Sequence, residues 1–146
     1  MLCELIAVIV IICSAAAVVM VLMPQKSERQ VVAEEAARAA AWFKYRMSKA
    51  ARERVAFDVQ MTSGGINDYE ATVTWYGGAM YMKHENFALK AADLNYLGGA
   101  SLLTFDGRWH TMTPAATFAI KSKSRSDIRL YMTISGTGYI DIREKL

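Results

Sequence analysis

The chain has 146 residues, a formal net charge of +3 and a hydrophobic fraction of 53%. This length allows one domain with an appendage, and the charge is too small to indicate a polyanionic partner by itself. The hydrophobic fraction exceeds that of an ordinary soluble domain, and the excess lies at the front of the chain. Cys3 and Cys13, the only cysteines, lie in that front segment, too far apart on one helix to form a disulfide.

The first predicted element is an apolar helix. From Leu5 to Met23 only Ser14 is polar, and a helix of that length is about 29 Å long, close to the thickness of the bilayer hydrocarbon. The front carries Glu4 but no lysine or arginine, so we predict a retained segment and not a cleaved secretory signal. A plain membrane anchor leaves Glu4 unexplained, because a carboxylate close to lipid needs a charge partner.

An amphipathic helix is predicted next. Pro24 follows the apolar run and loosens the preceding turn, after which the helical pattern resumes. Glu34 and Arg38 have the i, i+4 spacing that predicts an ion pair on the exposed face. The buried face is predicted from apolar residues at steps of three or four, namely Val32, Ala36, Ala39, Phe43, Met47 and Ala50.

After Arg54 the apolar residues alternate with a period of two, which is typical of half-buried strands. Gly77-Gly78, which would lead into a strand at 79–83, and Asp106-Gly107 are predicted hairpin turns. The fold class expected is α+β. Residues 1–54 form a long N-terminal helix, apolar in its first half and amphipathic in its second. Residues 55–146 form an antiparallel β-rich head of about seven short strands packed on that helix.

No motif in the chain indicates catalysis. His84 and His110 lack partners at a zinc-type spacing, and the glycine pairs lack the lysine or helix start of a phosphate-binding loop. We therefore expect no enzyme activity, no metal and no cofactor. One basic cluster, interleaved with serines, is either a solvated loop or a contact for an anionic partner such as nucleic acid or a neighbouring subunit: Lys121, Lys123, Arg125 and Arg129.

The first nine residues, Met1-Leu2-Cys3-Glu4-Leu5-Ile6-Ala7-Val8-Ile9, resemble the mature amino terminus of type IV pilins and pseudopilins. In that family a short basic leader is removed, the new terminal amine is methylated, and a glutamate near it begins a long apolar helix. Pro24 resembles the family's helix-loosening proline. The resemblance implies roles in assembly for Met1, Glu4 and Pro24, with the Glu4 carboxylate of one subunit paired to the terminal amine of a neighbour.

The head carries a second resemblance. Three segments, 55–61, 103–108 and 131–140, are similar to the domain shared by the H-type minor pseudopilin of type II secretion and related minor pilins. Some of those proteins bind DNA through basic residues near the carboxyl end, where Arg143 and Lys145 lie here with Glu144 between them. The chain departs from the family in two places: the glutamate usually sits one residue further along than Glu4, and the disulfide common near the carboxyl end is missing.

The leading hypothesis is a structural subunit of a helical, type IV pilus-like filament, serving adhesion, motility, secretion or DNA uptake. The subunit would wait in the inner membrane, be assembled by a membrane machinery, and end in an extracellular or periplasmic filament. One alternative is a minor pseudopilin that acts as an interaction module in type II secretion or DNA uptake. Another is a membrane-tethered β-domain that binds a ligand.

Overall fold

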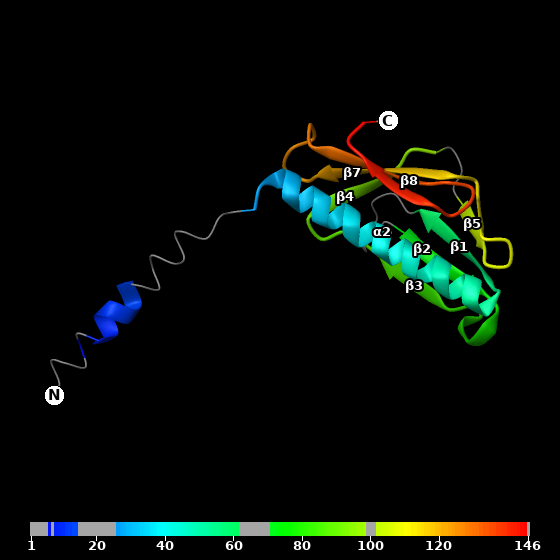
Figure 1. The fold of residues 1–146 in the computed structure, drawn as a ribbon, viewed down its shortest axis with the longest axis horizontal. Coiled ribbons are helices and arrows are strands. Elements are labelled where there is room, and N and C mark those ends of the chain that lie inside the picture. Colours follow the sequence, from blue (N-terminus) through cyan, green and yellow to red (C-terminus); the bar gives the residue numbers. More distant parts are fainter. Residues whose placement is uncertain (1–5, 7, 15–25, 62–70, 99–101, 146) are drawn as a thin grey trace.

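The computed structural model describes residues 6, 8–14, 26–61, 71–98 and 102–145 (Figure 1). Residues 8–14 are helical, and the long helix α2 spans Glu28–Glu53. Among the described residues nine strands follow it: β1 (Ala56–Met61), β2 (Ala71–Tyr76), β3 (His84–Phe87), β4 (Ala92–Tyr96), β5 (Leu102–Asp106), β6 (Thr111–Thr113), β7 (Ala116–Ser122), β8 (Arg129–Ile134) and β9 (Ile140–Arg143).

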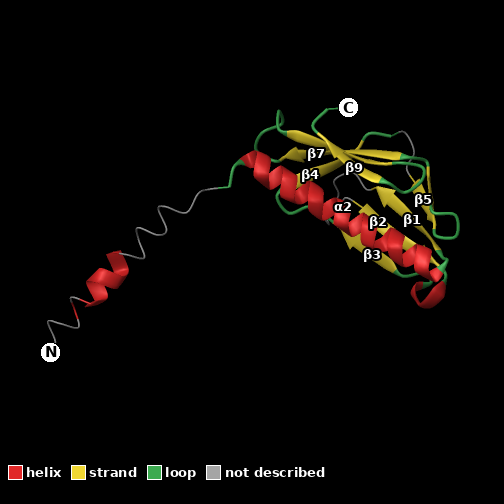
Figure 2. Ribbon diagram, in the orientation of Figure 1, coloured by secondary structure: helices red, strands yellow, loops and turns green. Residues whose placement is uncertain are grey.

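The strands form two antiparallel sheets. We name them sheet A, with the order β3-β2-β1-β5-β6, and sheet B, with the order β4-β7-β8-β9. Helix α2 contacts β4, β7, β8 and β9 of sheet B and β5 of sheet A. Figure 2 shows the helix lying across both sheets, so that one face of each is covered. The opposite face of each sheet is its outer face.

The core lies between α2 and the inner faces of the two sheets. The six apolar residues of the predicted stripe, Val32, Ala36, Ala39, Phe43, Met47 and Ala50, are all buried. The Phe43 ring lies 5.4 Å from that of Phe118 on β7, and Phe57 on β1 lies 5.4 Å from Phe105 on β5. The helix and both sheets therefore share one apolar cluster, as expected when a helix buries its apolar stripe against the faces of sheets.

The predicted α+β class, with a helix packed on an antiparallel head, is confirmed. The strand count is corrected from about seven to nine in the described part of the chain. One added strand is β4, whose Asp93 and Asn95 are poor strand formers and whose pairing to β7 depends on distant residues. The strand expected at 79–83 is wrong. Gly78–Met80 form a 3₁₀ turn, Met82 has a φ of 57°, and β3 begins only at His84.

The helix also differs from the predicted pattern at its start. Lys26 and Ser27 are not helical, and α2 begins at Glu28 as a separately capped helix. Pro24 and the first five residues lie outside the described residues. The helix ends at Arg54, which has a φ of 53° and donates its backbone N–H to carbonyls of the last turn.

The turn between β5 and β6 is fastened to the end of α2. The Gly107 N–H donates to the Val55 carbonyl at 3.0 Å. A Cβ at position 107 would lie 2.2 Å from the Ala50 carbonyl oxygen and 2.4 Å from that of Val55, both backbone atoms. Glycine is required here because the backbones approach each other too closely for any side chain.

Replacing Gly107 by alanine should therefore lower the free energy of unfolding by about 1–3 kcal/mol, the usual cost of overpacking. Urea unfolding followed by circular dichroism measures the change. Gly136→Ala is the matched control, because the nearest atom to its added Cβ lies 3.8 Å away. Equal stability of Gly107→Ala and Gly136→Ala would contradict the close approach.

Candidate assembly and partner surfaces

The described part of the apolar segment is a helix with exposed side chains on every side. Ile6, Val8, Ile9, Val10, Ile11 and Ile12 are each between 51% and 65% exposed. Burying a side chain of this size in an apolar surrounding contributes about 1.5–3 kcal/mol. Such a helix is stabilised only when lipid or other apolar helices cover it. Among the described residues no helix is long and apolar enough to cross a membrane.

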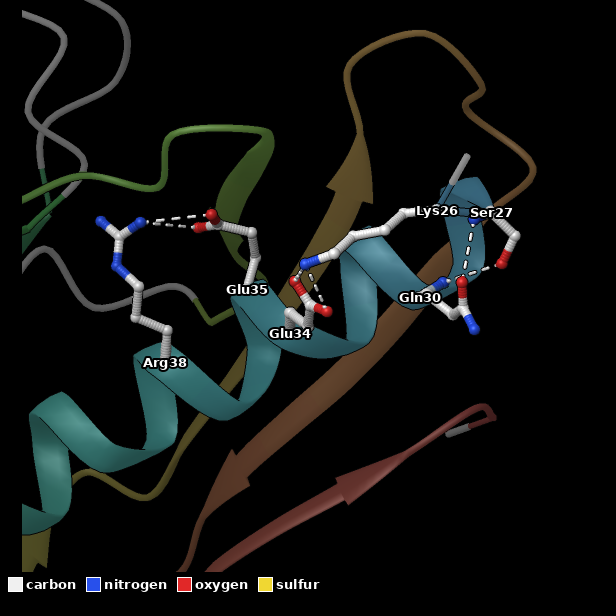
Figure 3. A network of polar contacts seen from close by, with 6 residues as sticks. All are labelled: Lys26, Ser27, Gln30, Glu34, Glu35 and Arg38. Atoms are coloured by element: carbon white, nitrogen blue, oxygen red, sulfur yellow. Dashed lines mark hydrogen bonds and ion pairs between the residues drawn. The ribbon is translucent and has the colours of Figure 1, made fainter. Parts of the chain in front are cut away.

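A polar network fixes the start of α2 (Figure 3). The Ser27 hydroxyl accepts from the Gln30 N–H at 3.3 Å, and the Gln30 side chain accepts from the Ser27 N–H at 3.0 Å. This reciprocal pair satisfies two backbone donors at the helix end. Lys26 Nζ lies 2.7 Å from a carboxylate oxygen of Glu34. The network therefore holds the chain just before the helix against its first turns.

The predicted pair of Glu34 with Arg38 does not form. Arg38 pairs with Glu35 at 3.2 Å, three residues earlier, and its other amino group donates to the Ala88 carbonyl at 2.7 Å. Glu35, only 9% exposed, also accepts from the Lys90 N–H at 3.2 Å. The pairing changes because the segment between β3 and β4 lies beside the helix and offers both groups tertiary partners. The sequence spacing does not reveal that neighbour.

A second tie joins the helix start to the loop between β7 and β8. The Ser122 hydroxyl donates to the Glu28 carboxylate at 2.6 Å, and Ser122 is buried. The same hydroxyl accepts the backbone N–H groups of Ser124 and Arg125, each at 3.2 Å. The hydrogen bonds from Ser122 and Ser124 lower the pKa of Glu28. Glu28 thus organises the loop that carries part of the predicted basic cluster.

The structure divides that basic cluster. Lys121 and Arg129 face each other across β7 and β8 and share the outer face of sheet B. Arg125 pairs with Asp127 at 2.8 Å, which raises the pKa of Arg125 and lowers that of Asp127. Lys123 is exposed on the loop. Only Lys121 and Arg129 therefore form a shared basic surface.

The carboxyl end extends this surface. Arg143 lies opposite Tyr131 in the register of β8 and β9, on the same outer face as Arg129. It pairs with Asp141 at 2.5 Å, whereas Arg129 lies 5.9 Å above the Tyr131 ring. Asp93 on β4 lies opposite Lys121. The outer face of sheet B therefore carries three basic groups, two nearby carboxylates and one aromatic ring.

A groove of about 910 Å³ lies between the first turns of α2 and β8. Its apolar lining includes Val32, Ile128 and Leu130. Charges of both signs line it as well, from Glu28, Arg29, Arg125, Asp127, Arg129, Glu144 and Lys145. Such mixed charge suits a polar protein contact better than a polyanion, which needs an excess of basic groups.

The two histidines are not brought together. His84 lies on β3, where its Nδ1 is 3.0 Å from the Thr74 hydroxyl, and His110 lies in the turn between β5 and β6 with a φ of 54°. No group of three metal-ligating side chains occurs in the described ranges.

The Glu28 contact predicts a dependence of stability on pH. A carboxylate with a lowered folded-state pKa stabilises the fold above its ordinary pKa, and the contribution is lost as the pH falls through the lowered value. The stability difference between the wild type and Glu28→Gln should therefore shrink from about pH 6 to about pH 3 in urea unfolding. Glu144→Gln is the control, since Glu144 has no hydrogen-bond partner among the described residues. A pH-independent difference for Glu28→Gln would count against the contact.

Comparison with known proteins identifies the fold. No family model and no curated protein matches the chain in sequence. Two crystal forms of the type IV minor pilin FimU of Pseudomonas aeruginosa strain PAO1 match in structure. The first has a TM-score of 0.58 at 21% identity and covers 80% of this chain and 90% of the chain in that crystal structure. The second has a TM-score of 0.56 at 19% identity, with 75% and 90% covered. Identity this low shows the fold alone, and the chain therefore has a type IV pilin-like fold.

Proposed function

We propose that this protein is a structural subunit that polymerises into a type IV pilus-like filament through its apolar N-terminal segment. The observation that carries the proposal is the combination of a pilin-like head with an apolar helix whose side chains are exposed on every side. An exposed apolar helix is stable in a bilayer before assembly and in a bundle of identical helices afterwards. The same segment would thus lie first in the bilayer and later among the apolar helices of the filament.

Polymerisation of this kind needs a heterologous contact, in which two different patches of each subunit meet and the contact repeats along a helix. In our proposal the apolar segments pack together and the Glu4 carboxylate of one subunit pairs with the terminal amine of its neighbour. A charge buried among apolar helices is costly unless it is paired. The pair would therefore favour one axial register over all others, while the apolar side chains supply most of the cohesion.

The capped start of α2 supports separate roles for the N-terminal segment, which would assemble, and the head, which would stay folded. Ser27 and Gln30 satisfy the backbone donors at the start of α2 without help from preceding residues. The head helix is therefore complete by itself and does not depend on helical structure before it. This property lets the segment before Lys26 change its surroundings between membrane and filament while the head stays folded.

Replacing Glu4 by alanine in the full chain should abolish filaments in the sheared surface fraction while the head still folds. The alanine removes the charge partner of the terminal amine but leaves the apolar surface in place. Electron microscopy and immunoblotting of that fraction measure assembly, and thermal unfolding measures the head. Glu53→Ala, an exposed carboxylate at the far end of α2, is the matched control. Normal amounts of Glu4→Ala filaments would show that the pairing is wrong.

A second candidate function is that of a minor subunit that binds an anionic partner, such as DNA during DNA uptake. The observation that favours it is the shared outer face of Lys121, Arg129 and Arg143 on sheet B, with Tyr131 beside Arg129. Basic groups on one face bind phosphates, and an aromatic ring beside them adds a stacking surface.

If this face binds DNA, the double variant Lys121→Ala/Arg129→Ala should weaken binding at every sequence and reduce the slope of log K against log salt by about 2. Gel shifts at several salt concentrations measure both quantities. Lys44→Ala, an exposed lysine of α2, is the control. An unchanged salt slope in the double variant would exclude this face as the DNA site.

A further inference from the structure

A hollow of about 870 Å³, separate from the groove at the start of α2, lies at the end of the head where α2 ends. Its base is formed by Ala56 on β1, which lies between Tyr76 on β2 and Asp106 on β5 in the register of sheet A. Because the alanine side chain is small and both neighbours are larger, the outer face of the sheet is depressed at this point. Arg54, Arg108 and Trp109 also line the hollow.

Two aromatic side chains at this hollow are exposed. Trp109 is 77% exposed and Tyr76 is 45% exposed. Trp109 lies in the turn that Gly107 fastens to the end of α2, and the next residue, His110, has a left-handed backbone with a φ of 54°. A non-glycine residue in that conformation costs about 1 kcal/mol, which the contacts of the surrounding fold must offset. The indole is thus presented by a turn whose first residues are hydrogen-bonded to the chain at the end of α2.

The polar groups around the hollow balance in charge. Glu53 and Asp106 supply two carboxylates, and Arg54 and Arg108 supply two guanidinium groups, for a net charge of zero. The lining therefore offers both acceptors and donors. A ligand that matches it has hydroxyl groups, each of which can donate and accept, and flat apolar faces that stack on aromatic rings.

The rest of the outer face of sheet A also offers hydrogen-bond donors and acceptors. A row of polar residues crosses all five strands in register: His84, Thr74, Asp58, Thr104 and Thr113. The Thr104 hydroxyl donates to Asp58 at 2.6 Å, and Thr74 lies 3.0 Å from His84. Asp58 also accepts a hydrogen bond from the Tyr76 hydroxyl, which raises the pKa of Tyr76. The five strands contain no lysine or arginine, in contrast to sheet B.

These charges distinguish between classes of ligand. A polyanion such as nucleic acid is disfavoured, because two carboxylates balance the two guanidinium groups of the hollow and no strand of sheet A carries a lysine or arginine. A lipid surface is disfavoured because it would bury four charged groups. An uncharged ligand rich in hydroxyl groups meets neither obstacle.

We propose that the hollow around Ala56, with Tyr76 and Trp109 as its aromatic walls, binds an uncharged oligosaccharide. A sugar ring would stack on Trp109 and Tyr76 while its hydroxyl groups bond to Asp106 and Arg108. The row of polar residues that crosses the sheet at Asp58 would receive the following sugar units. The hollow lies at the opposite end of α2 from the apolar segment, so binding does not depend on the proposed polymerisation.

The test uses the full chain in detergent micelles and three probes: N-acetylchitohexaose, cellohexaose and maltohexaose. We expect saturable binding of at least one probe by titration calorimetry, together with protection of tryptophan fluorescence from acrylamide. Trp109 supplies most of the accessible signal, since it is 77% exposed, whereas Trp75 is fully buried and Trp42 is half-buried. Trp109→Ala should weaken the affinity about tenfold or more through the lost stacking. Ala56→Leu, which fills the hollow from the outer face, should abolish binding.

Tyr139→Ala is the matched control, because Tyr139 is 69% exposed and does not line the hollow. Its affinity should equal that of the wild type. The proposal is overturned if none of the three probes binds saturably. It is also overturned if Ala56→Leu and Trp109→Ala, both folded by circular dichroism, bind as the wild type does, or if Tyr139→Ala loses as much affinity as Trp109→Ala.

Discussion

The head depends on the burial of one stripe of α2 against both sheets. The alanines at positions 36, 39 and 50 let the helix approach the strands closely, and Phe43 fills the space up to Phe118. Removing a large apolar side chain from water contributes about 1.5–3 kcal/mol. Sheets A and B share no strand, so the helix is the element that covers the inner faces of both. Without it the inner residues of each sheet would be exposed.

Polar contacts along the edge of this stripe set the position of the helix. Arg46 binds Glu85 of β3, and Glu85 accepts from the Trp75 indole N–H at 3.2 Å. The Arg46 guanidinium also lies 3.7 Å from the Trp42 ring, and its burial lowers the pKa of the group. An apolar stripe alone would let the helix slide along the sheets, whereas directional hydrogen bonds and ion pairs at one position fix it there. These contacts join α2 to β3, the edge strand of sheet A.

The two sheets give the head two different outer surfaces. Sheet B carries Lys121, Arg129 and Arg143 outward, and the strands of sheet A carry no lysine or arginine. The three basic residues lie on β7, β8 and β9, which are consecutive in the chain and adjacent in sheet B. A subunit packed side by side with copies of itself can then use one surface for its neighbours and keep another for a ligand.

Part of the site could be predicted from sequence. The helix stripe and most strands follow from local periodicity, because residues three or four apart share a helix face and alternate residues share a strand face. The pairing of Arg38 with Glu35, the tie from Glu28 to Ser122 and the outer row from His84 to Thr113 could not be predicted. Each joins residues whose proximity depends on how helix and strands pack.

By itself, the sequence determined an apolar segment, an amphipathic helix, a β-rich head and a resemblance to type IV pilins. Those properties are local, since they rest on hydropathy and period along the chain. Only the tertiary structure decided which of the four predicted basic residues share a face, and that Ala56 lies between Tyr76 and Asp106. Strand register determines both, and register is fixed by packing between residues tens of positions apart.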